Sequence, residues 1–278
     1  MNGLEARGKG RLILWGLLAA VIVLYGFPFL YLMLTSFKTP LDAIAVPPSV
    51  WPEKWSLDNY VLALSREGVP AALINSVVTA VLSTAMSMVL AVPAAYAITR
   101  FRTPSGQVFV FAALVARMVP TIAVGVPLID VMRSLHMTDT SIGLAVAHTT
   151  ISLPLSIWLM SSFFDAVPDE LDEAAKVDGC TRLQAMVKVV LPVVSGGLAV
   201  TAIFAFLASW NEFLFSLLLT SVRAQTTPIV IANFQSQFGL DWGGMTALAA
   251  VYSVPVILLT LFLQRHIVAG LTLGAVKG

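Results

Sequence analysis

The sequence predicts an all-α integral membrane protein with six transmembrane helices. Of its 278 residues, 58% are hydrophobic and 11% are charged, whereas a typical soluble domain is about 45–50% apolar. Six apolar stretches reach the roughly 20 residues that a membrane-spanning helix needs. Lysine and arginine are unevenly divided between the connecting segments, as expected of a chain with a fixed orientation in a bilayer.

The predicted spans make up one domain, residues 12–264, which follows a short N-terminus of residues 1–11 and precedes a C-terminal tail of residues 265–278. The spans comprise residues 12–34, 72–98, 108–132, 141–164, 193–219 and 246–264. The first apolar run lacks a small-residue cleavage pattern. We therefore expect it to be a retained anchor and not a removed signal peptide.

Positive charge predicts the orientation of the spans. Ten lysines and arginines lie outside the spans on the side of the N-terminus, and five lie on the other side. The positive-inside rule then places both termini and the segment 165–192 in the cytoplasm. The two long segments 35–71 and 220–245 are expected on the outer side.

Prolines interrupt the predicted spans, at positions 28, 93, 120, 127, 154 and 255. Each removes an amide donor and bends its helix, and neighbouring helices or water must satisfy the carbonyls that it frees. Membrane helices tolerate proline in general, which accounts for most of these positions. Pro120 and Pro127 lie close together on the third span, and we expect this pair to matter for function.

Two charges lie well inside the spans, Arg117 on the third and Glu212 on the fifth. The helical rise of about 1.5 Å per residue places both far from the edges of a hydrocarbon core about 30 Å thick. An unpaired charge at this depth costs at least about 2.5–3.5 kcal/mol. We hypothesise that Arg117 and Glu212 pair, or share a wet cavity, beside a transport path near Pro120 and Asn211. A purely structural role, with Arg117 bonded to carbonyls freed by the prolines, explains the two charges equally well.

The polar segment 165–192 predicts a short exposed helix. Pro168 suits a first helical turn, and the four acidic residues at 169, 170, 172 and 173 are favoured near a helix N-terminus. Ala174 and Ala175 are strong helix formers with little bulk. The helix can therefore enter a groove on a partner, where Glu173 would reach a basic group.

A turn and a second helix should follow in the same segment. Gly179 permits the left-handed conformation at which the chain changes direction. A helix from Thr181 to Val190 then leads to Pro192 and the fifth span. An ordinary amphipathic connector is the alternative interpretation, but the full set of residues at this spacing disfavours it.

Several classes of function are disfavoured. The net charge of +1 and the lack of a basic cluster give no reason to expect a nucleic-acid partner. Cys180 is the single cysteine, so no intrachain disulfide can form, and no Cys/His spacing suits a metal. We expect no catalytic residues, because the histidines at 136, 148 and 266 have no carboxylate or serine partner at useful spacing. For His148 a hydrogen-bonded packing role is the better interpretation.

The chain resembles the permease subunits of ATP-binding-cassette importers. The resemblance begins in their cytoplasmic docking motif, matched here by Glu173-Ala174-Ala175, Asp178-Gly179 and Leu191-Pro192. It covers nearly the whole chain and is nearest to the maltose-type carbohydrate branch. Further matching positions are Arg117 to Pro120, Trp210-Asn211-Glu212, and, in the tail, Gly270, Leu271, Thr272, Gly274, Lys277 and Gly278.

The resemblance implies a type I importer permease fold in a bacterial inner membrane. The implied partners are a second, different permease subunit, an ATPase dimer, an extracytoplasmic solute-binding protein and a sugar or polyol. The family works by alternating access, with the docking helix and the tail contacting the ATPase. This chain lacks a Gly-rich phosphate loop, so ATP and Mg would be bound by the ATPase, and we expect no cofactor on the permease.

The second outer segment, 220–245, occupies the position of the family's scoop, which enters the open binding protein. Its polar and aromatic candidates are Gln225, Thr226, Asn233, Gln235, Gln237 and Trp242. In the first outer segment, Trp51 and Trp55 are better interpreted as membrane-interface aromatics.

Two other classes of function fit the sequence less well. An ion-coupled secondary transporter would explain the charges inside the spans but not the docking segment or the tail. An intramembrane enzyme would need a paired aspartate, a Ser-His pair or a metal-ligand set within the spans, and the sequence does not suggest one.

Overall fold

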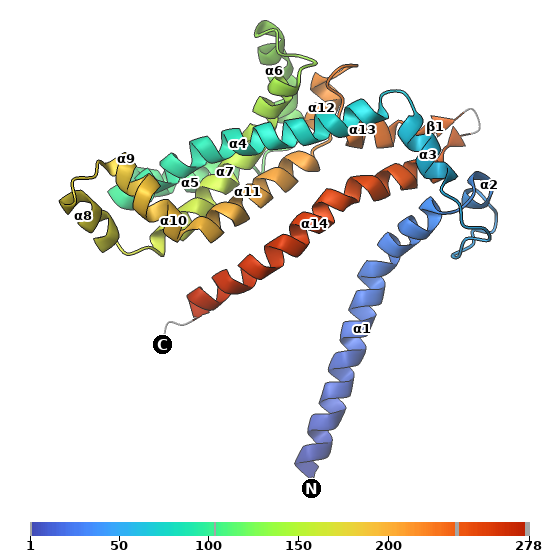
Figure 1. The fold of residues 1–278 in the computed structure, drawn as a ribbon, viewed down its shortest axis with the longest axis horizontal. Coiled ribbons are helices and arrows are strands. Elements are labelled where there is room, and N and C mark those ends of the chain that lie inside the picture. The colour runs from blue at the N-terminus through green and yellow to red at the C-terminus, as the bar shows by residue number, and fades with distance from the viewer. Residues whose placement is uncertain (1, 103, 237–238, 276–278) are drawn as a thin grey trace. The chain divides into compact units, whose positions relative to one another are not determined.

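The computed structural model describes residues 2–102, 104–236 and 239–275, which are largely helical (Figure 1). The chain forms two compact units. One comprises residues 1–69 and 231–253, and the other comprises residues 70–230 and 254–278.

The first unit begins with α1 (Asn2–Ser36), α2 (Pro40–Ala43) and α3 (Asp58–Ser65). It also contains a short hairpin of β1 (Gln235–Ser236) and β2 (Gly239–Leu240), which pair antiparallel with Ser236 opposite Gly239. The hairpin leads into α14 (Trp242–Ala275), whose first residues, to Ser253, belong to this unit.

Buried polar side chains fold the segment between α1 and α3. The Lys38 ammonium donates to the Ser49 carbonyl at 2.5 Å. The Asp42 carboxylate accepts from the Ser49 hydroxyl and from the Glu53 amide, each at 3.0 Å. The side-chain amide of Asn59 donates to the Lys38 carbonyl at 2.6 Å. These bonds satisfy buried polar groups that would otherwise destabilise the loop.

The second unit contains the remaining helices. They are α4 (Val69–Phe101), α5 (Pro104–Ala116), α6 (Thr121–Ser134), α7 (Ser141–Asp165), α8 (Glu170–Val177), α9 (Arg182–Ala185), α10 (Leu191–Val193), α11 (Ser195–Trp210), α12 (Leu214–Leu219) and α13 (Thr227–Ala232), the last of which extends past the unit boundary. A short π-helical segment, η1 (Met186–Val190), joins α9 to α10.

Four helices are long and apolar enough to cross a membrane, and the described residues supply up to six spans if two bent pairs are counted. The four are Leu14–Ser36, Val69–Phe101, Ser141–Asp165 and Trp242–Phe262. They match the predicted first, second, fourth and sixth spans.

The third and fifth spans are bent, as the prolines in the sequence predict for the third. The third bends by 98° between α5 and α6. Its turn contains the bonds from the Arg117 and Met118 amides to carbonyls three residues earlier, a tightening typical of a helix end. Pro120, which has no amide donor, then precedes α6.

The fifth span is broken at two places. A bend of 87° separates Arg182–Val193 from α11, and α11 ends at Trp210, before α12 begins at Leu214. The predicted span over 193–219 therefore consists of two helices with a break at residues 211–213.

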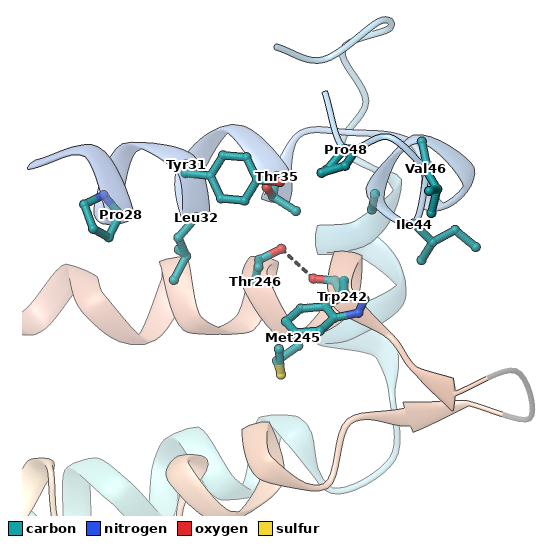
Figure 2. A pocket seen from close by; sticks show the side chains of 12 residues that line it. Pro28, Tyr31, Leu32, Thr35, Ile44, Val46, Pro48, Trp242, Met245 and Thr246 are labelled. Carbon is teal, nitrogen blue, oxygen red and sulfur yellow. Dashed lines mark hydrogen bonds between the residues drawn. The ribbon is translucent and has the colours of Figure 1, made fainter. Parts of the chain in front are cut away.

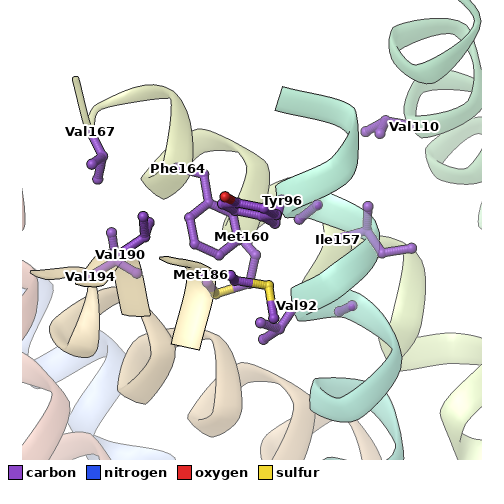
Figure 3. Packing of buried hydrophobic residues seen from close by; sticks show 12 residues of the cluster. Val92, Tyr96, Val110, Ile157, Met160, Phe164, Val167, Met186, Val190 and Val194 are labelled. Carbon is purple, nitrogen blue, oxygen red and sulfur yellow. The ribbon is translucent and has the colours of Figure 1, made fainter. Parts of the chain in front are cut away.

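An apolar core holds α4, α7 and η1 together (Figure 3). It includes Tyr96, Met160, Phe164, Met186 and Val190. The Tyr96 and Phe164 rings meet edge to face with centroids 5.6 Å apart, a favourable geometry for aromatic rings. Leu171 of α8 packs against this core.

Helices α7 and α11 pack side by side in the second unit (Figure 1). A Cβ atom added at Gly197 would lie 2.4 Å from the Phe163 ring. Any larger residue at this position would have to displace the Phe163 ring, so glycine allows the start of α11 to approach the end of α7.

Candidate functional site

The segment after α7 folds as the sequence predicts. Helix α8 begins at Glu170 and carries three acidic residues in its first turn and Lys176 in its last, both favoured by the helix dipole. Gly179 has a φ of +84°, the left-handed conformation expected of it. The predicted change of direction at Gly179 is confirmed.

The start of the second helix contains a capping box that our reading of the sequence missed. The Thr181 hydroxyl accepts from the Gln184 amide at 3.3 Å, and the Gln184 side chain accepts from the Thr181 amide at 2.8 Å. The spacing Thr-x-x-Gln is a recognised helix start, so this feature could have been found from the sequence. It sets the direction in which the chain leaves Gly179.

The surface of this segment carries most of the predicted ATPase-docking residues. Glu173, Ala174, Asp178, Gly179 and Pro192 are exposed, and Leu191 is half-buried. Ala175 differs from the prediction, because it lies on the buried side of α8 and is not exposed to a partner. The docking role of the exposed residues stays a prediction.

An ion-pair network joins the α8 segment to the end of α4. The Arg100 guanidinium donates to the Asp172 carboxylate at 2.6 Å, to the Asp169 carboxylate at 2.8 Å and to the Val167 carbonyl at 3.2 Å. The Tyr96 hydroxyl donates to the same Asp172 carboxylate. The planar guanidinium suits such multiple recognition, and it fixes the position of α8 relative to α4.

A second arginine supports this network from the surface. Arg102 contacts Asp169 at 2.5 Å and is exposed. From the sequence alone, Arg100 and Arg102 were counted only as positive charges, and their structural role was not predicted. The available signal was the acidic cluster at 169–173, which was predicted to lie on the same side of the membrane.

A cavity of about 280 Å³ lies beside the network. It is lined by Tyr96, Arg100, Phe101, Asp169, Asp172, Glu173, Lys176 and Arg182. The Arg182 guanidinium covers the Phe101 ring at 4.7 Å from its centroid, a cation–π geometry. The cavity is therefore lined by acidic, basic and aromatic side chains next to the exposed face of α8.

The Glu212 carboxylate lies at the break between α11 and α12. Its two oxygens accept from the Phe215 amide at 2.8 Å and the Ser216 amide at 3.2 Å, so it caps α12. One of them lies 3.1 Å from His148 Nε2 on α7. The other ring nitrogen of His148 lies 2.7 Å from the Ser209 hydroxyl.

These contacts correct two of our expectations. Glu212 is only 8% exposed and pairs with His148, whereas Arg117 is exposed, so the hypothesised Arg117–Glu212 pair is wrong. The statement that His148 lacks a carboxylate or serine partner is also wrong. Its partners lie more than sixty residues away in sequence, and only the packing of α7 on α11 brings them together.

Ser209, His148 and Glu212 have the residue types of a hydrolytic triad, but their environment does not suit catalysis. All three side chains are buried. His148 Nδ1 lies at hydrogen-bond distance from Ser209, its Nε2 faces the carboxylate of Glu212 at 3.1 Å, and that carboxylate accepts from two helix amides. A nucleophile must reach its substrate, so the cluster has a packing role, which confirms the expectation for His148.

The remaining pathway candidates lie at the surface of the second unit. Arg117, Pro120 and Asn211 are exposed, and the Asn211 side chain donates to the Leu207 carbonyl at 2.9 Å. A side-chain amide at the break of a predicted span is available to a solute or a partner. The pathway role of these residues stays a prediction.

A larger cavity of about 560 Å³ lies within the first unit, between α1, the segment after α2 and the start of α14 (Figure 2). Its walls are mainly apolar and include Tyr31, Val46, Trp242 and Met245. Trp242, one of the scoop candidates, belongs to this wall.

The other scoop candidates have different surroundings. Asn233 is exposed and Gln225 is half-buried, but Thr226 is buried and does not face the surface as expected. The side chain of Gln235 and the whole of Gln237 lie outside the described residues.

For the tail candidates, the structure describes the α14 backbone through Gly270, Leu271, Thr272 and Gly274. The side chains of this stretch, together with Lys277 and Gly278, lie outside the described residues.

Known proteins resemble this chain over nearly its full length. It is 38% identical over 278 residues to a trehalose transport system permease protein of Mycobacterium tuberculosis, covering 98% of this chain and 100% of the relative. It is 35% identical to a trehalose/maltose transport system permease protein of Thermococcus litoralis, covering 96% of each chain.

The fold also matches a solved structure. A chain of a bacterial ABC transporter involved in the import of the acidic polysaccharide alginate superposes with a TM-score of 0.75 at 21% identity, over 94% of this chain and 96% of the other. The predicted type I importer permease fold is confirmed by this likeness. Residues 68–273, which include both the α8 segment and the broken fifth span, match the family described as "Binding-protein-dependent transport system inner membrane component", and the chain belongs to that family.

Proposed function

We propose that this chain is the permease subunit of an ATP-driven importer for a sugar or a sugar-like solute. The observation that carries the proposal is the α8 segment. Its exposed Glu173 and Ala174 project from a helix that Arg100 holds to the end of α4. Such a rigid, exposed helix can transmit movement from an ATPase to the membrane helices. The trehalose and maltose permeases among its relatives support the class of solute.

The proposed complex contains a second permease subunit, an ATPase dimer that binds ATP and Mg, and an extracytoplasmic solute-binding protein. Both termini and α8 would lie in the cytoplasm of a bacterial cell, with the C-terminal tail against the ATPase. The distribution of lysine and arginine supports this orientation. The long apolar face of α1 would contact lipid or the second permease.

The proposed mechanism is alternating access. Closure of the ATPase dimer on ATP would move α8, and the network at Arg100 and Tyr96 would pass that movement to α4. The pair of permease subunits would then open outward and receive the solute from the binding protein. An ion-coupled secondary transporter would have no use for an ATPase-docking helix.

The proposal is tested by replacing the exposed acid of α8. Glu173→Gln should remove one charge-assisted contact with the ATPase, worth about 1.5–3 kcal/mol. ATPase copurification and binding-protein-stimulated ATP hydrolysis should fall together in reconstituted complexes. Glu67→Gln is the matched control, because Glu67 is also exposed but precedes α4 at its other end.

Two results would contradict the proposal. One is a chain that supports solute uptake without copurifying with any ATPase. The other is uptake that continues when ATP is depleted but stops when ion gradients are collapsed, which would indicate a secondary transporter.

A further inference from the structure

An uncharged cavity lies inside the first unit, at the end of α1 (Figure 2). It has a volume of about 560 Å³, and none of the twelve described residues that line it carries a charge. Three segments supply its walls: the last turns of α1, the residues between Ala43 and Pro48, and the first turns of α14. An occupant of this cavity must be largely apolar, because a buried charge would find no partner there.

The cavity extends from the end of a membrane span toward its middle. Thr35 lies one residue before the end of the span Leu14–Ser36, and Pro28 lies deeper. At about 1.5 Å per residue, Pro28 is about 12 Å below Ser36, which is within one leaflet of a hydrocarbon core about 30 Å thick. Few residues of this span are buried by the rest of the described chain. The cavity is therefore continuous with an apolar helix surface that is exposed at the depth of lipid chains.

The segment after α1, which forms one wall of the cavity, has the polarity opposite to that of a water-exposed loop. Lys38 and Asp42 are buried, with 1% and 8% of their surface exposed, whereas Leu41 is 80% exposed and Val46 is 93% exposed. In water a chain buries apolar side chains and leaves lysine and aspartate at the surface. The reversal fits a segment whose outer surface meets lipid.

Tryptophans indicate the depth of this segment. Trp51 and Trp55 are exposed, and their rings meet edge to face with centroids 6.2 Å apart. Trp242, on the cavity wall, is exposed as well. Tryptophan is enriched at membrane–water interfaces, where its ring meets the apolar core and its indole N–H stays near water. The segment therefore lies at the level of the lipid headgroups, and the cavity lies at the level of the first acyl carbons.

One polar group in the cavity wall lacks a partner. Thr35 is 5% exposed, and its hydroxyl oxygen has no hydrogen-bond partner among the described residues. The other threonine of the wall, Thr246, donates to the Trp242 and Gly243 carbonyls at 2.7 and 3.1 Å (Figure 2). A buried hydroxyl without a partner is destabilising, so the occupant should bring an acceptor to Thr35. The ester carbonyls of a phospholipid lie at the boundary of the hydrocarbon core, the depth at which Thr35 ends its span.

The size of the cavity favours a lipid chain over a helix of a partner protein. An α-helix with its side chains is about 10–12 Å across, so a helical segment with the volume of this cavity would be about 7 Å long or less. This length is below two helical turns. A single acyl chain is thin enough to follow the cavity along α1.

We propose that this cavity binds one acyl chain of a phospholipid from the outer leaflet, and that an ester carbonyl of the lipid accepts a hydrogen bond from the Thr35 hydroxyl. The proposed orientation of the chain supplies only the choice of leaflet. The bound lipid holds the end of α1 at the bilayer surface, whatever solute the transporter carries.

The test uses the complex purified from membranes in detergent, titrated with dioleoyl phosphatidylglycerol and with its ether-linked analogue, which lacks the ester carbonyls. The midpoint of thermal unfolding should rise with the ester lipid, since a ligand that binds the folded state stabilises it. The ether lipid should bind about two- to tenfold more weakly, because it has no carbonyl to accept from Thr35.

Thr35→Val tests the contact directly, because valine keeps the shape of threonine and removes its hydroxyl. Without added lipid the variant should unfold at or above the wild-type temperature, since it loses an unpaired buried hydroxyl. It should bind the ester and ether lipids equally. Thr246→Val is the matched control, because it makes the same change in the same wall at a hydroxyl that is already bonded within α14. This control should keep the wild-type preference for the ester lipid.

A photo-crosslinking residue separates a lipid occupant from a protein occupant. Val46 lines the cavity and is exposed, so benzoylphenylalanine in its place should attach to phosphatidylglycerol in proteoliposomes. Attachment mainly to another protein subunit would overturn the inference. A wild type that binds both lipids equally would also overturn it, as would an ester preference that is lost equally in Thr35→Val and Thr246→Val or kept in both. None of these results bears on ATPase docking, so the proposed function stands or falls separately.

Discussion

Asp172 is the residue on which the position of the α8 segment depends most directly. It is buried and accepts from both Arg100 and Tyr96. Loss of one partner from a buried ion pair is costly because the other charge remains desolvated. Arg100, however, keeps its bonds to Asp169 and to the Val167 carbonyl, so a single substitution should remove only part of the stabilisation.

Asp172→Asn should therefore destabilise the protein by about 1.5–3 kcal/mol, the value of a hydrogen bond to a charged group. The double variant with Asp169→Asn should approach about 3–5 kcal/mol, because Arg100 is then left without a carboxylate. Thermal unfolding in detergent measures both. Asp130→Asn, in an exposed pair with Arg133, should change stability by about 0–1 kcal/mol, and an equal loss there would contradict the argument.

At Glu212 the structure changes the prediction that the sequence suggests. The energetic interaction should be between Glu212 and His148, whose side chains are 3.1 Å apart, and not between Glu212 and Arg117. Glu212→Gln and His148→Gln should be non-additive in stability, whereas Glu212→Gln and Arg117→Gln should add within about 0.5 kcal/mol. Double-mutant cycles that compare the stability of the folded complex in each variant measure these interaction energies. Additivity of the first pair would remove the proposed role of the His148–Glu212 contact.

Among the elements, the turn between α8 and α9 depends on one backbone angle. A side chain at Gly179 would meet no atom within 4 Å, but its φ of +84° disfavours any residue with a Cβ. The cost of a left-handed conformation is about 1–2 kcal/mol for most residues, and it is greater for β-branched ones. The direction of the second helix is therefore sensitive to substitutions that change no contact.

Gly179→Val should lower ATPase copurification and stimulated hydrolysis, whereas Gly179→Asn should retain most of both, because asparagine tolerates the left-handed region. Gly196→Ala is the matched control. Gly196 also has open space around it, but it lies in the first turn of α11 and not at a left-handed position, so an alanine fits there without strain. If Gly179→Val and Gly196→Ala behaved alike, the backbone argument would fail.

At the scale of the molecule, α4 connects the loop after α12 with the α8 segment. One unbroken helix, Val69–Phe101, donates to the Arg223 and Gln225 carbonyls through Asn75 and bonds to the α8 segment through Tyr96 and Arg100. Pro93 lies between these contacts, where it can bend the helix. A displacement at one end of such a helix is carried to the other, because both ends are held by buried or multiple hydrogen bonds.

The sequence by itself determined the features that depend on local composition. The apolar runs predicted the membrane class, and Gly179 with the acidic residues before it predicted the short helix and the turn at α8. These features depend on helix length, backbone angles and nearby charges, all of which are readable within a window of about 20 residues.

Only the tertiary structure decided which polar groups meet. Glu212 lies against His148, Asp172 bonds to Arg100, and Asp139 bonds to the amides of residues 221–224. Each pair is separated by more than sixty residues, and periodicity within one helix carries no information about its neighbour. Inside a membrane a buried polar group must find a partner, but which partner it finds is set by helix packing, such as the close approach of α7 and α11 at Gly197.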